Sequence, residues 1–459
     1  MITRRTLLGA VGATGAAGAT TLAATLATTA TMRSAISQTA GDDYRALVVI
    51  YLNGGNDGNN TLVPLDGGYG DYQTARQTLA LPRDSLLPLA GSPGGRSLGV
   101  HPALAPLAAL YGQQRLAFVA NVGPLVQPCT AHQVLDGSVD VPPFLLSHSD
   151  QTAMVQGWGA SDDASGWAGR ALELLPSRLQ HRLAAVTSNT NRTLVLGRRT
   201  PVSFMDSSDS TWWGIGDLKR PQEIGPQTLA RMAQWQFANA YEAEYSRSFG
   251  LTFEDATAIA KARQLAVPAT VDFGNDNDRV ARGLRNLSSM LPVFKAQGLK
   301  RQVFLQSWGS FDTHANQRGT AAETQDAQLA VLAKALTAFD QSNRVNGMDN
   351  NVVTLVMTEF GRTVRPGSGG GSEHAWGNHW LAMGGPVAGG NVVGTYPSLV
   401  LGGADDGDVR KNGRHVPSLS CDQVGATLMQ WLGLPAAQFH DVFPNLVNFN
   451  QKTVALLRA

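Results

Sequence analysis

Side chains that could bind a metal ion follow three apolar stretches of the sequence, each at the point where the stretch ends. Asp57 lies in NGGNDGNN, Asp312 and His314 lie in GSFDTHANQ, and Glu359 lies in TEFGRT, which leads to His374. Carboxylates and neutral imidazoles are the side chains that hold Zn, Mn and similar divalent ions. Together these five would supply three carboxylates and two imidazoles. We therefore predict a site for one or two divalent ions, with Zn, Mn, Ca and Mg left open.

The stretch SGGGSEHAWGNHW, residues 368–380, carries two histidines in a loop that is too rich in glycine to pack as a core. The chain has nine histidines, and four of them lie in polar loops of this kind. Glycine lets the backbone come close to a site. We expect this loop to bring His374 toward the other ligands. For His379 we keep three interpretations: a second metal ligand, a substrate contact, or a brace for the loop.

Each of these residues also has a purely structural interpretation. Asp57 could be a turn residue, since Asp is common in Gly/Asn loops. Asp312 and His314 could cap the helix that follows them, and Glu359 could form an ion pair with Arg362. The coincidence of all these residues at strand ends favours the metal site.

Such a site suits hydrolysis of a phosphate or sulfate ester, because a divalent ion can polarise the ester oxygen and lower the pKa of a nucleophile. Ser147, in the fourth polar loop LLSHSDQ, is the candidate nucleophile, because a serine beside a metal can be activated without a histidine base. Arg362 is the candidate bidentate clamp for the anionic group. The alternative for Ser147 is a helix N-cap, with Asp150 in the first turn.

Short apolar runs rich in β-branched residues predict the buried strands that must position these loops. The runs occupy residues 46–52, 115–123, 193–197, 301–314 and 351–363. Helical patterns separate them, which indicates an α/β fold with a mainly parallel central sheet flanked by helices. In such a sheet, ligands bind beyond the carboxyl ends of the strands.

Helix boundaries are marked most clearly in two places. Thr320 and Glu323 have the spacing of a capping box before an amphipathic helix, and Ser420 and Gln423 have it before a second helix that should stop at Gly433. Residues 205–300 read as mostly helical, and we interpret them as an insertion. We expect residues 41–459 to form a single domain that includes this insertion.

Residues 1–40 have the form of a twin-arginine export signal. Arg4 and Arg5 precede a long uncharged stretch of Ala, Gly, Thr and Leu, with small residues suited to cleavage. Its glycine and threonine content makes it a poor spanning helix, and no other segment has the pattern of a membrane span. We therefore predict a periplasmic or secreted protein that is handled by the twin-arginine translocation machinery.

Charge and cysteine content narrow the remaining classes. The formal net charge is +1, which argues against a nucleic-acid partner. The two cysteines, Cys129 and Cys421, could form a disulfide in an oxidising compartment or remain free thiols. Two cysteines are too few for a cysteine-rich zinc or iron–sulfur site.

Several motifs resemble those of the bacterial family known as domain of unknown function 1501, and they follow the family's order along nearly the whole mature chain. They are LNGGNDGNNTLVP, LGVHPALAPLAALY, SHSDQ, GWAGRALE, GSFDTHANQ, TEFGRT and GGGSEHAWGNHWLAMGGPVAGGNVVGTYP. The resemblance implies an alkaline-phosphatase/sulfatase-like fold with metal ligands at strand ends. The family's usual Ser-His-Phe-Asp reads Ser147-His148-Ser149-Asp150 here, and its Gly-Thr-Asp-His reads Gly371-Ser372-Glu373-His374.

A second hypothesis is a non-catalytic periplasmic protein on the same fold that binds a glycan, an envelope polymer or a protein partner. It is motivated by tryptophans close to the motifs, whose rings could stack on sugars: Trp158, Trp167, Trp308, Trp376 and Trp380. The first hypothesis remains a metal-dependent hydrolase that acts on an anionic ester.

Overall fold

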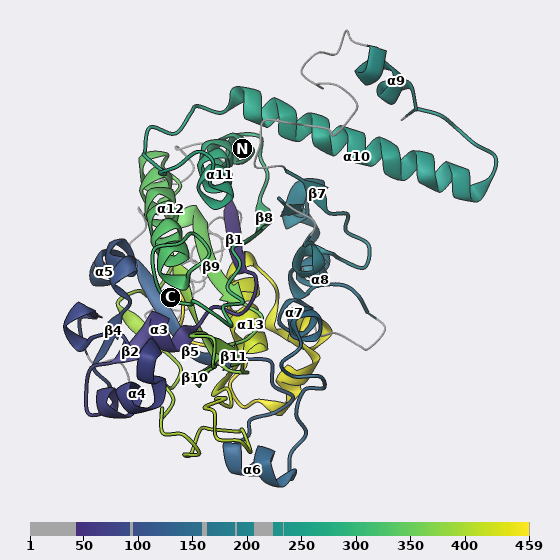
Figure 1. Cartoon of the computed structure of the whole chain (residues 1–459). Coiled ribbons are helices and arrows are strands. Elements are labelled where there is room, and N and C mark those ends of the chain that lie inside the picture. Colours follow the sequence, from purple (N-terminus) through teal and green to yellow (C-terminus); the bar gives the residue numbers. More distant parts are fainter. Residues whose placement is uncertain are drawn as a thin grey trace, which may run out of the picture. The chain divides into compact units, whose positions relative to one another are not determined.

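A nine-stranded sheet lies at the centre of the described part of the chain (Figure 1). Its strands are β1 (Arg45–Leu52), β5 (Leu116–Gly123), β6 (Ala185–Thr187), β7 (Ser203–Phe204), β8 (Arg301–Trp308), β9 (Val352–Thr358), β12 (Asn378–Met383), β13 (Asn391–Val393) and β14 (Leu419–Ser420). The order is β13-β5-β12-β9-β1-β8-β6-β7, with β14 also paired to β5. Among these described strands, β12 runs antiparallel to its neighbours β5 and β9, and every other pairing is parallel. The predicted mainly parallel α/β fold is confirmed.

The computed structural model describes residues 43–91, 95–157, 163–188, 191–205, 224–232 and 234–458. Tyr44–Ala459 forms one compact unit. Two smaller sheets are built from β2 (Leu62–Pro64), β3 (Leu87–Pro88) and β4 (Leu98–Val100), and from β10 (Arg362–Pro366) and β11 (Ser372–His374). The helices are α3 (Gly58–Thr61), α4 (Gly68–Arg76), α5 (Ala105–Gly112), α6 (Ala131–Asp136), α7 (His148–Gln156), α8 (Trp167–Leu174), α9 (Ile224–Met232), α10 (Ala240–Leu265), α11 (Arg279–Ala296), α12 (Gln325–Val345), α13 (Cys421–Leu432) and α14 (Phe439–Val442).

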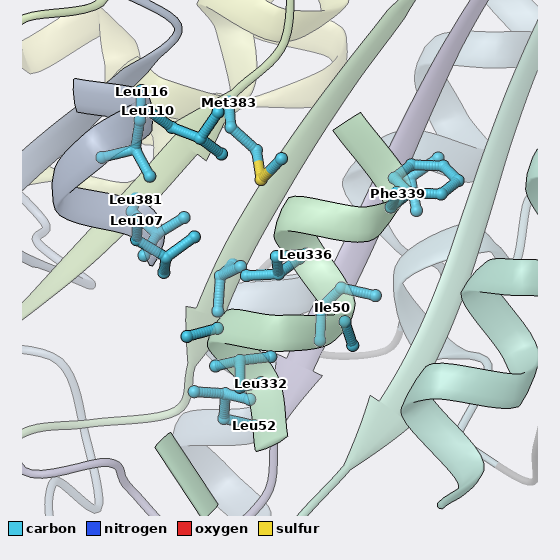
Figure 2. Packing of buried hydrophobic residues seen from close by; sticks show 14 of the residues in the cluster. Ile50, Leu52, Leu107, Leu110, Leu116, Leu332, Leu336, Phe339, Leu381 and Met383 are labelled. Atoms are coloured by element: carbon cyan, nitrogen blue, oxygen red, sulfur yellow. The ribbon is translucent and has the colours of Figure 1, made fainter. Parts of the chain in front are cut away.

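The central strands are buried on both faces, which explains their largely apolar sequences. Val48 and Ile50 of β1 point into one hydrophobic core, whereas Leu47 and Val49 point into a second core. The first core contains residues of α5, α11 and α12, and the second contains residues of α8 and α13. Figure 2 shows the first core, where Leu336 of α12 packs near β1. The sheet is therefore a rigid layer that fixes where its strand ends lie.

The two predicted capping boxes have different outcomes. Ser420 and Gln423 form both hydrogen bonds of the box at the start of α13, and Gly433 ends this helix in a left-handed conformation, as expected. The box predicted at residues 320 and 323 is wrong. Thr324 is the N-cap of α12 instead, and its side chain accepts a hydrogen bond from the backbone N–H of Ala327. The helix therefore begins later than predicted, and Ala327 occupies the position where a capping box needs Glu or Gln.

The run at residues 193–197 is not a strand. It begins with a short 3-10 turn, Thr193–Val195, whose Leu194 and Val195 side chains are buried in the second core. Its apolar character is explained by burial, without pairing to the sheet. The described residues between 205 and 300 include the three helices α9, α10 and α11, and the proposed export signal at residues 1–40 lies outside the described residues. Among the described helices, none is both long and apolar enough to cross a membrane.

Candidate metal centre

The carboxyl ends of three neighbouring parallel strands meet at one edge of the central sheet. Leu52 at the end of β1 lies opposite Trp308 of β8 and opposite Thr358 of β9. The loop after β1 is tied to the loop after β8, because the N–H of Asn53 donates to the carbonyl of Trp308, and the N–H of Phe311 donates to the carbonyl of Asn53. The three polar loops therefore begin side by side, as predicted.

Three histidines and one aspartate converge at this edge, and we name His148, Asp312, His314 and His374 the histidine–aspartate cluster. Nε2 of His314 and Nε2 of His374 lie 2.9 Å and 3.1 Å from Oδ1 of Asp312. Nε2 of His148 lies 3.4 Å from Oδ2 of the same carboxylate. The Nε2 atoms of His314 and His374 are 3.0 Å apart. Four side chains from three separate segments of the chain thus converge, and ligand atoms of His148, Asp312 and His374 all lie within 4.8 Å of one another.

The other ring nitrogen of each histidine, Nδ1, faces an oxygen acceptor. The acceptors are Glu359 Oε1 at 2.9 Å from His148, Glu373 Oε2 at 2.8 Å from His314, and the Leu146 carbonyl oxygen at 2.8 Å from His374. Ionised carboxylates and carbonyls only accept hydrogen bonds, so this network assigns a proton to each Nδ1. In the neutral ring Nε2 then offers a lone pair. Metal-binding histidines are held in this way in proteins, with the second nitrogen bonded to a carboxylate or carbonyl.

The charges around His374 agree with this assignment, whereas those around His148 favour its protonated form in the absence of a metal ion. Burial, reinforced by the charge of Arg362, lowers the pKa of His374 below its ordinary value of 6.5, so His374 is neutral at neutral pH. The hydrogen bond to Glu359 raises the pKa of His148. Burial alone would raise the pKa of Asp312, but Arg362 and His374 outweigh it and lower that pKa to about 2. A lone pair on His374 that faces another Nε2 and an ionised carboxylate is stabilised by a cation between them.

The donor set also indicates which ions fit. Imidazole suits Zn and other transition ions, whereas Ca and Mg prefer oxygen ligands. The side chains of His148, Asp312 and His314 are 39%, 39% and 41% exposed, so the cluster is open to solvent. This openness distinguishes it from a closed structural zinc site.

Arg362 does not have the role of a substrate clamp that the sequence suggested. Its side chain is fully buried, and its guanidinium donates to protein acceptors: the carbonyls of Gly54, Gly55, Phe311 and Ser372, and Oδ1 of Asp312. These contacts engage all three nitrogens of the guanidinium. Arg362 therefore holds the strand-end loops together and fixes the carboxylate of Asp312.

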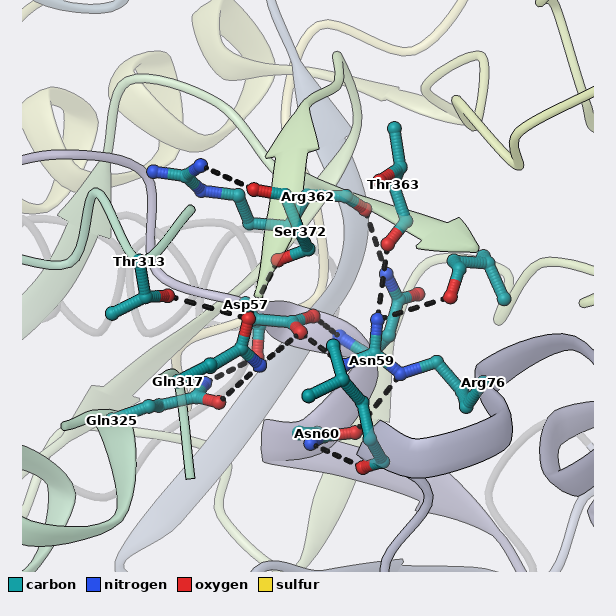
Figure 3. A network of polar contacts seen from close by, with 12 residues as sticks. Asp57, Asn59, Asn60, Arg76, Thr313, Gln317, Gln325, Arg362, Thr363 and Ser372 are labelled. Atoms are coloured by element: carbon teal, nitrogen blue, oxygen red, sulfur yellow. Dashed lines mark hydrogen bonds and ion pairs between the residues drawn. The ribbon is translucent and has the colours of Figure 1, made fainter. Parts of the chain in front are cut away.

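Asp57 lies outside the cluster, in a fully buried ion pair with Arg76 (Figure 3). Its Oδ1 accepts a hydrogen bond from the N–H of Asn59 at 3.0 Å, which makes Asp57 the N-cap of α3. Its Oδ2 also accepts from Nε2 of Gln317 at 2.7 Å. The carboxylate is thus already compensated by a cation and two hydrogen bonds. The structure assigns Asp57 a structural role in place of the predicted metal-binding role.

A buried polar network links the Asp57 pair to Arg362 (Figure 3). Oε1 of Gln317 accepts from the hydroxyl of Ser372 at 2.6 Å, and the carbonyl of Ser372 accepts from Nη1 of Arg362 at 2.9 Å. Arg362 in turn contacts Asp312. Asp57 in NGGNDGNN and Arg362 in TEFGRT therefore contribute to the site by supporting Asp312.

Glu359 and His379 also differ from their predicted roles as metal ligands. Glu359 is 3% exposed and acts as the hydrogen-bond partner of His148, while the N–H of Gly54 donates to it at 2.7 Å. His379 is buried against the ring of Tyr396, and burial lowers the pKa of His379 to about 3. His379 Nδ1 accepts from a backbone N–H on β5 at 3.0 Å. Of its three interpretations, the buried brace fits this environment.

Ser147 is the N-cap of α7, as its structural interpretation expected. Its hydroxyl accepts a hydrogen bond from the N–H of Asp150 and contacts the carboxylate of the same residue. Capping by Ser147 begins a helix whose first residue is His148. The serine therefore helps to place a cluster histidine.

Sequence reasoning missed two residues of the site, His148 and Glu373. His148 lies in the SHSDQ motif, but it follows a long excursion after β5, so no strand end marked it as part of the same edge. Glu373 precedes His374 in the same motif and bonds to His314. The signal that could have pointed to Glu373 was the rule that each metal-binding imidazole needs an outer oxygen partner.

Close approach of two loops requires a glycine at position 371. A Cβ atom there would lie 2.1 Å from the carbonyl oxygen of Thr313 and 2.3 Å from the carbonyl carbon of His314. Leu146 has a φ of 73°, which is uncommon for a bulky residue, and its carbonyl is the acceptor for His374. Its conformation is held by the buried Gln151, whose side chain accepts from the N–H of Leu146. Local backbone strain of this kind is common where a functional site is built.

The tryptophans that motivated a stacking surface are mostly in the interior. Trp167, Trp376 and Trp380 are each 4% exposed and belong to the second core. Trp308 is half-buried at the end of β8, and residue 158 lies outside the described residues. The three core rings are therefore unavailable for stacking on a sugar.

Comparison with solved structures found distant similarities. A lipoteichoic acid synthase, LtaP, from Listeria monocytogenes is 10% identical at a TM-score of 0.33, over 86% of this chain and 74% of that one. The soluble domain of lipooligosaccharide phosphoethanolamine transferase A from Neisseria meningitidis is 12% identical at 0.31, over 91% and 94%. The PsFucS1 sulfatase from Pseudoalteromonas sp. is 10% identical at 0.32, over 88% and 74%. TM-scores this low carry no argument about fold or function.

Comparison with curated proteins found no match. The family model described as "Protein of unknown function (DUF1501)" matches residues 44–422, which is most of the chain and includes all four cluster residues. The family match agrees with the resemblance identified from the sequence motifs. The chain belongs to the DUF1501 family.

Proposed function

We propose that this protein is an exported metal-dependent hydrolase of a phosphate or sulfate ester, with one transition-metal ion held by the histidine–aspartate cluster. The observation that carries the proposal is the convergence of three Nε2 atoms on the carboxylate of Asp312, with each Nδ1 bonded to an oxygen acceptor. Zinc is the ion we expect, because three imidazoles and one carboxylate suit it better than Ca or Mg.

A bound divalent ion would supply a Lewis acid for the ester oxygen and would lower the pKa of a water molecule. The residues of the chain prepare the site for this. Glu359 and Glu373 fix the ring orientations of His148 and His314, and Arg362 fixes Asp312. The exposed side of the cluster leaves room for substrate and water. Because Ser147 is engaged as a helix cap, we propose water as the nucleophile.

Export through the twin-arginine pathway remains part of the proposal and rests on Arg4 and Arg5 in the N-terminal sequence. We expect a mature protein in the periplasm or outside the cell. Replacement of both arginines by lysine should retain the precursor in the cytoplasm, as seen by cell fractionation. Export of the double lysine variant at the normal level would refute this assignment.

Metal content and ester turnover test the proposed function together. The exported wild-type protein should contain about one equivalent of transition metal and should hydrolyse an aryl phosphate or aryl sulfate, with loss of activity on chelation. His374→Ala should lose most of the metal. His132→Ala is the matched control, since His132 is an exposed histidine on α6 and should retain both metal and activity. Metal-free wild-type protein whose melting temperature ignores added zinc and chelator would contradict the proposal.

The alternative, a non-catalytic binding protein, loses much of its motivation because Trp167, Trp376 and Trp380 lie in the core. It still makes a distinct prediction. If Asp312→Ala and His314→Ala leave partner binding and phenotype intact, a function independent of the cluster is required.

A further inference from the structure

The cluster and its outer partners carry an unusual balance of charge for a site that receives an anion. Three carboxylates belong to it: Asp312 in the cluster, Glu359 behind His148, and Glu373 behind His314. Among the ion pairs that the described residues form with the cluster and these carboxylates, Arg362 is the one lysine or arginine partner. A divalent ion together with Arg362 would therefore only balance the three carboxylates.

Arg362 cannot add to the attraction for a substrate. Its guanidinium is fully buried, and each of its three nitrogens already donates to a protein acceptor, so it is not presented to a substrate anion. Sites that bind a phosphate dianion commonly use a free arginine fork for its equatorial oxygens. The described cluster has no such group in contact with it.

Two other arginines near these loops are also committed. Arg414 donates from Nε to the carbonyl of His374 at 3.0 Å, and its Nη1 lies 3.5 Å from Oδ1 of Asp408. Arg76 is paired with Asp57 below the site. Both cations therefore already have a carboxylate partner.

We propose that the site selects esters with a single negative charge, such as sulfate monoesters and phosphodiesters, over phosphate monoesters with two. This inference rests on the proposed function and narrows its substrate class. Because the ion and Arg362 already balance the three carboxylates, each negative charge that a substrate adds lacks a counter-charge, and a dianion brings one more such charge close to Glu373 and Asp312 than a monoanion does. For a second charge close to these carboxylates in a partly exposed site, Coulomb repulsion corresponds to a preference of roughly tenfold or more for the singly charged ester over the doubly charged one.

A matched pair of non-hydrolysable ligands separates charge from shape. Benzenesulfonate and phenylphosphonate have the same ring and a similar tetrahedral head, but above the second ionisation of the phosphonate they carry one and two negative charges. Binding of each to the zinc-loaded protein is measured by titration calorimetry. In parallel, turnover is measured with three substrates: p-nitrophenyl sulfate, bis(p-nitrophenyl) phosphate and p-nitrophenyl phosphate. The monoanions should be preferred by about tenfold in Kd and in kcat/KM.

Glu373→Gln tests the charge balance within the same site. A glutamine oxygen can still accept from Nδ1 of His314, but one negative charge is removed. The variant should reduce the discrimination against phenylphosphonate roughly tenfold while it retains the metal. Glu242→Gln is the control, because Glu242 is exposed on α10 and makes no contact with the cluster, and it should leave the ratio unchanged.

The possible failures are distinguishable. If phenylphosphonate binds as tightly as benzenesulfonate, and the phosphate monoester is turned over as well as the sulfate, the inference is wrong although the hydrolase proposal stands. If metal-loaded protein binds neither ligand, the inference is also wrong. Protein that takes up no metal removes the hydrolase proposal and the inference together.

Discussion

Replacement of Arg76 by methionine tests whether Asp57 belongs to the scaffold or to the metal site. Arg76 and Asp57 are both fully buried, and they form a direct ion pair. Arg76 also donates to Asn60 and to the carbonyls of Thr363 and Val364 at 3.0–3.2 Å. The substitution leaves a buried carboxylate without its cation and removes one donor from each of three acceptors.

The expected cost of Arg76→Met is about 3–5 kcal/mol of unfolding free energy, which is the usual penalty when one partner of a buried ion pair is removed. The double variant Asp57→Asn, Arg76→Met should recover about half of that loss, because the lone charge is gone. Urea denaturation of wild type, both single variants and the double variant measures this coupling. Arg410→Met, at an exposed arginine, is the control and should change stability by less than about 0.5 kcal/mol.

Metal analysis of the same variants decides between the two roles of Asp57. If Asp57 is structural, the folded double variant keeps its full equivalent of metal. Loss of the metal from a double variant that remains folded would refute the reasoning, and so would an Arg76→Met cost below about 1 kcal/mol.

Three further predictions concern the cluster and its loops. Gly371→Ala should lower metal affinity and melting temperature, because its Cβ would collide with the backbone at residue 313, whereas Gly112→Ala has open space and should be neutral or slightly stabilising. His379→Ala should destabilise the protein but leave its metal content unchanged, as elemental analysis can check. In chelator-treated protein, the His148–Glu359 pair should stabilise the fold most between the ordinary pKa values of Glu, 4.5, and His, 6.5. Because the pKa of His148 is raised, this stabilisation is lost as the pH rises through that pKa. Because the pKa of Glu359 is lowered, the stabilisation is also lost as the pH falls through the Glu359 pKa. His148→Gln should flatten this dependence of the melting temperature on pH.

Much of the fold could be predicted from the sequence because buried strands and helices have recognisable patterns of apolar residues. The largely apolar runs of β1, β8 and β9 indicated parallel strands, and a parallel sheet places the ends of its strands together. The caps of α13 were also readable, since a capping box depends on residues three apart. Asp312, His314 and His374 were found by this route.

The errors arose where a side chain finds a partner far along the chain. Asp57 looked like a ligand because its cation, Arg76, comes from the following helix, and periodicity does not report such a pair. Arg362 looked free because its acceptors are mainly backbone carbonyls, which every residue has. His148 was assigned no metal role because its loop reaches the site from a helix start. The chemistry of a polar residue could be predicted from its type, but its role depended on which neighbour the fold supplies.

The central claim is that one ion binds between His148, Asp312, His314 and His374, and anomalous scattering from a crystal of the exported protein tests it most directly. Data on both sides of the zinc absorption edge should show a single strong peak within coordination distance of the three Nε2 atoms and the Asp312 carboxylate, about 2.0–2.2 Å from each ligand atom. A peak beside Asp57 or His379, or no peak in protein supplied with metal during folding, would contradict the account.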